Sequence, residues 1–191
     1  VFPKEKKIIG FSRNNDGGVP ENFHNYFVIY LDKEIDSVYI WNGTALSANS
    51  FESKGEHVGT VVKLKVKENE KVNIKIASSF ISYDQAELNL KYEIGNDTFE
   101  QTLNKAKNTW NEGLNRIEVD GGSEEQFKTF YTALYRTMLF PRKFYEIDKN
   151  NNVVHYSPYN GEILPGYMFT DNGFWDTFRA VFPFFTIMQR E

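Results

Sequence analysis

The period of the hydrophobic pattern changes near residue 83, and this change constrains the fold more than any other feature of the sequence. Before it, apolar and polar residues alternate, which is typical of strands that have one face in water. After it, apolar residues recur every three or four positions, which indicates amphipathic helices. The 191 residues therefore predict a β region followed by an α region.

The β region is most regular between residues 62 and 76. Its apolar residues alternate with lysine or asparagine on both sides of a central "ENE", at Val62, Leu64, Val66, Val72, Ile74 and Ile76. This alternation predicts an antiparallel hairpin with one wet face. Further short strands at 26–31 and 37–41, with no helix between them, predict an antiparallel β-sandwich.

The α region carries the sequence signals of helix starts. A short helix is expected over 84–90. Asp97 with Glu100, and Ser123 with Gln126, have the three-residue spacing of capping boxes. The helix after Asp97 is expected to have an apolar stripe formed by Phe99, Leu103, Ala106, Trp110 and Leu114.

A long excursion over residues 143–169 separates the helix after Ser123 from the last aromatic stretch. Loops of this length are usually functional or support a functional segment. Asp171 in "TDNG" is expected to be an N-cap. The final helix is expected to run from about Gly173 to the end, to be buried nearly all round and to be kinked at Pro183.

Composition excludes several classes of function. The chain has no cysteine, which excludes disulfides and thiolate metal sites or nucleophiles. A net charge of -4 without an extended basic patch argues against nucleic acid as a partner. No stretch approaches the ~20 apolar residues of a membrane span. The loop with Asp148, Asn150 and Asn152 resembles the start of an EF-hand, but Val153 and Tyr159 stand where that motif needs glycine and glutamate, so an Asx turn is expected.

Trp175 and Asp176 are the candidate binding residues, because an acid inside the densest aromatic stretch needs polar partners. Arg179, three residues further on, offers a local ion pair. The alternative is a carbohydrate subsite. There the carboxylate accepts hydrogen bonds from sugar hydroxyls and the indole packs against the C–H groups of the ring.

Three stretches, "AKNTWNEGLNRIEVDGG" (106–122), "GGSEEQFKTFYTALYRTMLFPR" (121–142) and "DNGFWDTFRAVFPFF" (171–185), resemble glycoside hydrolase family 92. These enzymes are calcium-dependent, inverting exo-α-mannosidases that are abundant in Bacteroidetes. The tract from Trp175 to Arg179 is the most specific part of the resemblance, which extends more loosely over the β region.

The resemblance implies the fold class β then α. Residues 1–83 would be part of an N-terminal antiparallel β-sandwich, 84–119 a helical linker, and 120–191 the first helices of an (α/α)6 catalytic barrel. Trp175 and Asp176 would line the subsite of the terminal mannose in a glycan substrate such as an N-glycan. The general acid, the general base and the calcium ligands would lie beyond Glu191, so this chain would contain no catalytic or metal-binding residue.

The resemblance also implies a periplasmic, cell-surface or secreted protein. Since the chain begins at Val1 and ends without a helix-stop signal, we expect the remainder of a parent chain to complete the site. The fragment alone is then expected to be inactive. Two alternatives are a non-catalytic carbohydrate-binding or scaffold module, and another (α/α)6 glycosidase or phosphorylase family.

Overall fold

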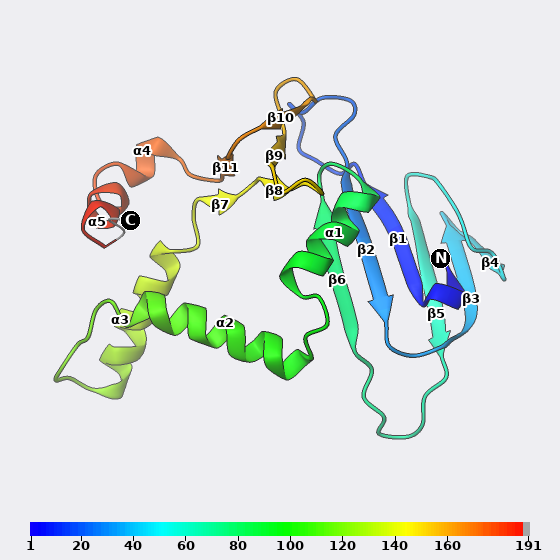
Figure 1. The fold of residues 1–191 in the computed structure, drawn as a ribbon, viewed down its shortest axis with the longest axis horizontal. Coiled ribbons are helices and arrows are strands. Elements are labelled where there is room, and N and C mark those ends of the chain that lie inside the picture. Colours follow the sequence, from blue (N-terminus) through cyan, green and yellow to red (C-terminus); the bar gives the residue numbers. More distant parts are fainter. Residues whose placement is uncertain (189–191) are drawn as a thin grey trace. The chain divides into compact units, whose positions relative to one another are not determined.

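The computed structural model describes residues 1–188, apart from the side chains of Phe174 and Asp176. The chain divides into two compact units (Figure 1). Unit 1 contains Val1–Asn96, Glu146–Asn152 and Tyr156–Leu164, and unit 2 contains Asp97–Tyr145, Val153–His155 and Pro165–Glu191. A β-rich region comes first and helices follow, which confirms the predicted order.

Unit 1 contains two antiparallel, three-stranded sheets (Figure 1). The first has the strand order β1-β2-β6 and the second has the order β4-β3-β5. The elements are η1 (Pro3–Glu5), β1 (Lys7–Ser12), β2 (Asn25–Leu31), β3 (Ile35–Asn42), β4 (Ala45–Ala48), β5 (Val58–Leu64) and β6 (Ile74–Ser79). Their branched and aromatic residues favour the extended backbone.

The helix α1 (Tyr83–Glu93) covers one face of the first sheet and contacts β2 and β6 (Figure 1). Lys7 and Tyr30 lie opposite each other in the register of β1 and β2, so their side chains share a face of the sheet. Both donate hydrogen bonds of 3.0 Å to the Glu87 carboxylate on α1. This polar cluster holds α1 on the sheet.

The core of unit 1 draws apolar residues from both sheets. Ile8 and Leu31 point away from α1, because they alternate with Lys7 and Tyr30, and they are nevertheless buried. Val38, on β3 of the second sheet, is also buried. Each sheet therefore has at least one face that is removed from water.

The predicted hairpin between 62–67 and 72–76 is wrong. The strand β5 pairs with β3, and β6 pairs with β2, so the chain between them passes from one sheet to the other. The ends of this connection bond to the turn that joins β2 to β3. The Lys65 N–H donates to the Glu34 carbonyl oxygen, and the Asn73 N–H donates to Asp32 Oδ1.

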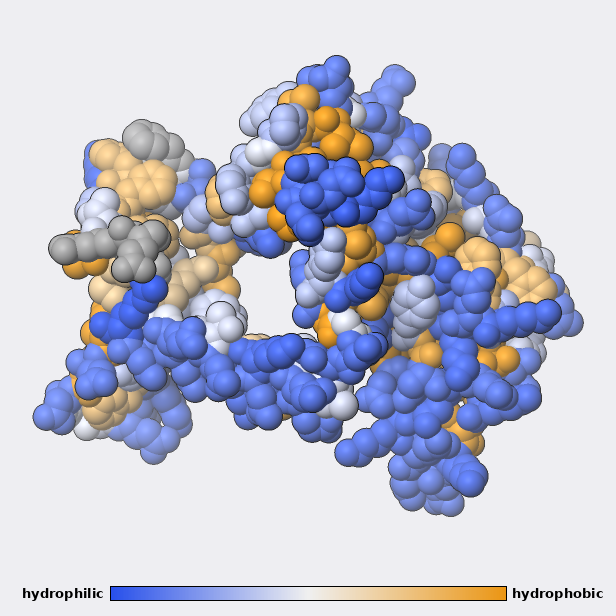
Figure 2. All heavy atoms as spheres, in the orientation of Figure 1, coloured by the Kyte–Doolittle hydropathy of each residue, from blue (hydrophilic) through white to orange (hydrophobic). Residues whose placement is uncertain are grey.

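The alternating pattern on β6 is oriented opposite to the expectation. Ile74 and Ile76 are 54% and 58% exposed, whereas Lys75 between them is half-buried and donates a 2.7 Å hydrogen bond to the Gly95 carbonyl oxygen. Long lysine side chains can bury their methylene stems while the ammonium group finds an acceptor. Figure 2 shows hydrophobic residues reaching the surface among hydrophilic ones in both units.

Two capped helices, α2 (Phe99–Leu114) and α3 (Glu124–Thr137), form the first part of unit 2. The capping box of Ser123 with Gln126 is confirmed. The predicted cap at Asp97 is wrong by one residue, because Thr98 forms the box with Gln101 and Asp97 pairs with Lys105 instead.

The apolar stripe on α2 is covered only in part by the described residues. Trp110 packs against Tyr135 of α3 with ring centroids 4.5 Å apart, and Leu114 is half-buried. Phe99 and Leu103, in the first half of the helix, are exposed. The stripe therefore supports helix–helix packing at its C-terminal end.

Short strands and polar turns form the excursion 143–169 and its two ends. They are β7 (Arg142–Lys143), β8 (Glu146–Ile147), β9 (Val153–Tyr156), β10 (Ile163–Pro165) and β11 (Phe169–Thr170). The Asx turn expected at Asp148 is confirmed, because its Oδ1 accepts the N–H groups of Asn150 and Asn152, both at 2.8 Å. These bonds, above all those of Asn152, hold the pKa of Asp148 below its usual range.

The expected single helix after Gly173 is two helices, α4 (Phe174–Thr177) and α5 (Val181–Met188). Pro183 explains the break, because a proline inside a helix removes a backbone donor, whereas in a first turn that donor has no partner anyway. The expected burial all round is also wrong for the described residues of α5, where Ile187 is exposed. The expected continuation over 189–191 lies outside the described residues. Across residues 1–188, each helix is too short or too polar to cross a bilayer.

Candidate substrate-binding site

The two predicted site residues, Trp175 and Asp176, lie on α4, the four-residue helix that follows the excursion. The indole of Trp175 is 82% exposed. The backbone of Asp176 belongs to α4, while its side chain lies outside the described part of the chain, so both interpretations of this carboxylate stay predictions. An exposed tryptophan presents a flat apolar face that a ligand or a further part of the protein can cover.

The local structure of α4 is fixed by hydrogen bonds at both ends of the turn. The Thr177 hydroxyl donates to the Gly173 carbonyl oxygen at 2.7 Å, and the Ala180 N–H donates to the Thr177 carbonyl oxygen at 3.3 Å. Beyond the turn, the Arg179 guanidinium lies 5.1 Å from the centre of the Phe178 ring. This arrangement is a cation–π contact.

A short antiparallel ribbon joins the two ends of the excursion and leads into α4. Its strands are β7 and β11, with Arg142 opposite Thr170 and Lys143 opposite Phe169 (Figure 1). The Phe144 N–H extends the ribbon by donating to the Met168 carbonyl oxygen at 2.9 Å. We call this ribbon, with Asp171 at its end, the neck of the excursion.

Asp171 is not the N-cap that the sequence predicted, because α4 begins three residues later. Its Oδ2 instead accepts a hydrogen bond from Arg142 Nε at 2.5 Å and another from the Thr170 hydroxyl at 3.0 Å. The Arg142 guanidinium, followed by the Thr170 hydroxyl, holds the pKa of the Asp171 carboxyl below its usual range. Asp171 is therefore ionised at neutral and mildly acidic pH.

Aromatic rings flank the neck on the side of the excursion. Tyr145 makes edge-to-face contacts with Tyr167 and Phe169, at centroid distances of 4.7 and 5.7 Å. The Lys143 ammonium lies 4.7 Å from the centre of the Tyr145 ring. Tyr167 and Phe169 are mostly exposed, so they add apolar surface close in sequence to Trp175.

Sequence reasoning missed the polar network that docks the excursion on unit 1. Glu146 Oε1 accepts the Phe80 N–H at 3.0 Å, and its Oε2 accepts from Asn89 Nδ2 at 2.6 Å. Gln85, which is buried on α1, donates to the Ile147 carbonyl oxygen at 2.7 Å. The only signal in the sequence is that α1 places two amide residues, Gln85 and Asn89, four positions apart on one face.

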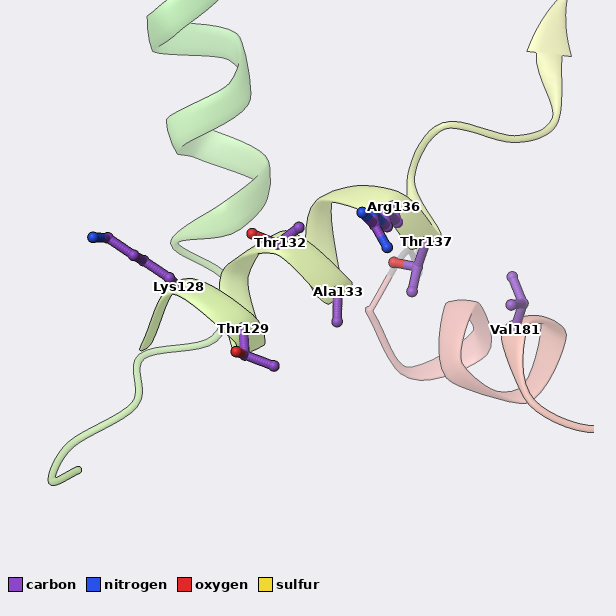
Figure 3. A pocket seen from close by; sticks show the side chains of 7 residues that line it. All are labelled: Lys128, Thr129, Thr132, Ala133, Arg136, Thr137 and Val181. Atoms are coloured by element: carbon purple, nitrogen blue, oxygen red, sulfur yellow. The ribbon is translucent and has the colours of Figure 1, made fainter. Parts of the chain in front are cut away.

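An open hollow lies along α3 and has a volume of about 630 Å³ (Figure 3). It is lined by Lys128, Thr129, Thr132, Ala133, Arg136, Thr137 and Val181. Its lining contains no carboxylate, so this hollow does not supply the acid and base that glycoside hydrolysis needs.

Among the side chains that the structure describes, no three His, Cys, Asp or Glu residues come together as metal ligands would. Carboxylate oxygens are the ligands that calcium prefers. The described residues therefore do not fit a calcium site of their own.

Both halves of the chain match models of one family. The model of the glycosyl hydrolase family 92 N-terminal domain matches residues 1–79, and the model of the glycosyl hydrolase family 92 catalytic domain matches residues 85–191. The gap between the two matches, residues 80–84, includes the start of α1. The excursion thus belongs to the sequence of the catalytic domain, although most of it lies in unit 1.

Solved structures resemble the chain over nearly its whole length. A family GH92 inverting mannosidase from Bacteroides thetaiotaomicron VPI-5482 is 44% identical, with a TM-score of 0.94 over 97% of this chain and 25% of that protein. A family GH92 α-mannosidase from Bacteroides thetaiotaomicron, at 24% identity, has a TM-score of 0.77 over 95% of this chain and 25% of its own, and shows the fold alone.

A curated relative from the fungus Arthroderma benhamiae, described as an uncharacterized secreted glycosidase, is 34% identical over 92 residues. This match covers 45% of the present chain and 12% of the relative. The chain spans about a quarter of the solved relatives that it matches. Because the catalytic-domain model alone matches more than half of the residues, the chain belongs to glycosyl hydrolase family 92.

Proposed function

We propose that the protein containing this chain is an exo-α-mannosidase that removes terminal α-linked mannose from glycans with inversion of configuration. The observation that carries the proposal is the 44% identity to an inverting mannosidase over 97% of this chain. The family membership favours a hydrolase over a non-catalytic carbohydrate-binding or scaffold module. It also favours family 92 over the other (α/α)6 families considered above.

Trp175 and Asp176 are the residues of this chain that we assign to the substrate. The exposed indole of Trp175 offers a platform for the C–H face of the terminal mannose. The Asp176 carboxylate would accept hydrogen bonds from hydroxyls of the same sugar, and such charged hydrogen bonds are among the stronger polar contacts. Together they bind and orient the ring and exclude water from one of its faces.

Inversion needs two further carboxyl groups, one that protonates the leaving oxygen and one that activates a water on the opposite face, about 6.5–9.5 Å apart. We assign both to the remainder of the protein. The isolated chain is then inactive, because it binds at most one end of the substrate and cannot move the two protons.

Calcium is the cofactor that we propose for the complete enzyme, on the resemblance to family 92. Bound there, it would act as a Lewis acid and a template for the sugar hydroxyls. The described residues do not fit a calcium site, so its ligands are assigned to the remainder of the protein.

The architecture proposed for the complete protein is a β-sandwich, a helical linker over 84–119 and an (α/α)6 barrel that begins near 120. Two sheets with buried residues on each support the sandwich, and α2 packing on α3 supports a helical second half. A secreted, periplasmic or cell-surface location is proposed because a relative is described as a secreted glycosidase.

The test is hydrolysis of α-1,2-, α-1,3-, α-1,4- and α-1,6-linked mannobiosides by the full-length protein. We expect release of mannose from at least one of them, and proton NMR during the first turnovers should show the β-anomer before mutarotation. Release of the α-anomer first would contradict inversion. No release from any α-mannoside by folded, calcium-loaded protein would overturn the proposed function.

A further inference from the structure

The neck of the excursion is a fixed point between α3 and α4. The chain leaves α3, forms β7 at Arg142 and Lys143, passes through the excursion, and returns at β11 directly opposite. The backbone ribbon and the ring contacts of Tyr145 hold the two ends together. The neck therefore sets the direction in which the chain enters α4, independently of the conformation of the rest of the excursion.

The ion pair of Arg142 with Asp171 closes this neck. The two side chains are 66% and 39% exposed, and pairs in such surroundings contribute little to folding stability. A role in stabilising the unit is thus a weak explanation for this ion pair.

The backbone of Asp171 points to a geometric role. Its φ of 63° lies in the left-handed region, which is unfavourable for residues other than glycine, although asparagine and aspartate tolerate it. This conformation turns the chain abruptly between β11 and α4. The bond from Arg142 holds the carboxylate of the turning residue in place.

Trp175 follows the turn by four residues, so a change in the direction of the chain at Asp171 moves the indole. A displacement of about 1 Å at a substrate-binding group can lower the rate of an enzyme by up to ~10²-fold. The Asp171 side chain is hydrogen-bonded to Arg142 and Thr170. An effect of this bond on substrate binding would pass through the direction of α4.

We propose that Arg142 and Asp171 are positioning residues, whose bond at the neck of the excursion sets the direction of α4 and so places Trp175 and the backbone of Asp176 beside the terminal sugar. This inference rests on the proposed function for the identity of the ligand. The bond itself belongs to unit 2 and involves only described side chains.

The test uses the full-length enzyme with Arg142→Gln, Asp171→Asn, and both together. Asparagine also tolerates the left-handed backbone and removes only the charge. Asp171→Asn therefore tests the ion pair without changing the backbone preference of the turn. We expect kcat/KM to fall about 10-fold in each single variant, mainly through a higher KM. The kcat/KM of the double variant should be no lower than that of the more impaired single variant. Arg142→Lys, which keeps a charged donor, should recover part of the loss.

Glu124→Gln is the matched control. It breaks an ion pair of the same unit, on α3, in which Lys128 Nζ lies 2.7 Å from Glu124 Oε1. The side chains of this pair are more exposed than those of Arg142 and Asp171. We expect this control to leave both kcat/KM and Tm unchanged, and the neck variants to keep Tm within about 2 °C of it. Hydrogen exchange of the amides of residues 172–177 should be faster only in the neck variants.

Asp176→Ala, measured in parallel, separates the two proposals. If Asp176→Ala is impaired while the neck variants keep full kcat/KM and unchanged hydrogen exchange, the positioning role is wrong and the proposed function stands. If Asp176→Ala retains full activity, the assigned subsite itself is wrong. Equal, additive losses in the double variant would also contradict the positioning role, because they would show that Arg142 and Asp171 act separately.

Discussion

Glu146 Oε2 lies 2.6 Å from Asn89 Nδ2, so a carboxylate of the excursion is held by a side chain of α1. The other oxygen of Glu146 accepts the backbone N–H of Phe80, just after β6. One side chain thus satisfies a donor on α1 and a donor at the end of a strand. This is how the excursion becomes part of unit 1.

The first prediction concerns this docking. Glu146→Ala leaves two donors without their partner, and we expect it to lower the free energy of unfolding by about 1–3 kcal/mol. Limited proteolysis of the full-length protein should then cleave the excursion faster. The matched control is Glu162→Ala, since Glu162 is in the same segment and its carboxylate bonds only locally, to Asn160 Nδ2 at 2.9 Å. Equal effects of the two variants would contradict the docking role.

The second prediction concerns Lys7, which is 16% exposed and bonds to Glu5 at 2.8 Å and Glu87 at 3.0 Å. Lys7→Met is expected to lower the free energy of unfolding by about 1 kcal/mol at pH 7, as judged from urea midpoints. Lys65→Met, whose ion pair with Glu34 is long and exposed, should have no measurable effect.

The pH dependence of the Lys7 effect has a definite sign. The carboxylates, Glu5 before Glu87, raise the pKa of Lys7 above its ordinary value. A raised pKa of a cation means that its contribution is fully present below the ordinary lysine pKa of about 10.4 and is lost as the pH rises through the folded-state value. The difference between Lys7→Met and the unmodified protein should therefore be constant from pH 6 to 9. A difference that instead vanished near pH 7 would contradict the assigned ion pairs.

The third prediction concerns calcium. Chelation should abolish mannoside hydrolysis by the full-length protein, and added calcium should restore it, because we assign the metal to the substrate site of the complete enzyme. The isolated chain of 191 residues should show no saturable calcium binding by titration calorimetry. Tight binding by the isolated chain would mean that its acids form a site that the described residues do not show.

Elements specified by neighbouring residues were predictable from the sequence. The cap of α3 is an example, since Ser123 and Gln126 satisfy each other's backbone donors within one turn. The sequence predicts the cap of α2 one residue too early, because Asp97 and Thr98 are both capping residues with a polar partner three positions on. The local sequence therefore fits two cap positions equally well. In the structure Thr98 is the cap, and Asp97 pairs with Lys105, about two turns further along the chain.

Features that depend on distant partners were not predictable. The alternation over 62–76 indicates strands correctly, but nothing in it tells which sheet each strand joins. Asp171 carries the signal of an N-cap, and only the fold brings Arg142 to it across the excursion. The candidate site was found because Trp175 and Asp176 are adjacent in the sequence, whereas its supports at the neck and at Glu146 are not.

The most direct measurement is the kcat/KM of full-length Asp176→Ala on an α-mannobioside, beside Glu124→Gln as the control for folding. We predict a loss of about 10²-fold or more with unchanged Tm, because a charged hydrogen bond to the sugar is removed. Undiminished turnover would contradict the assignment of this carboxylate to the substrate. It would favour the alternative, in which Asp176 forms a local ion pair with Arg179.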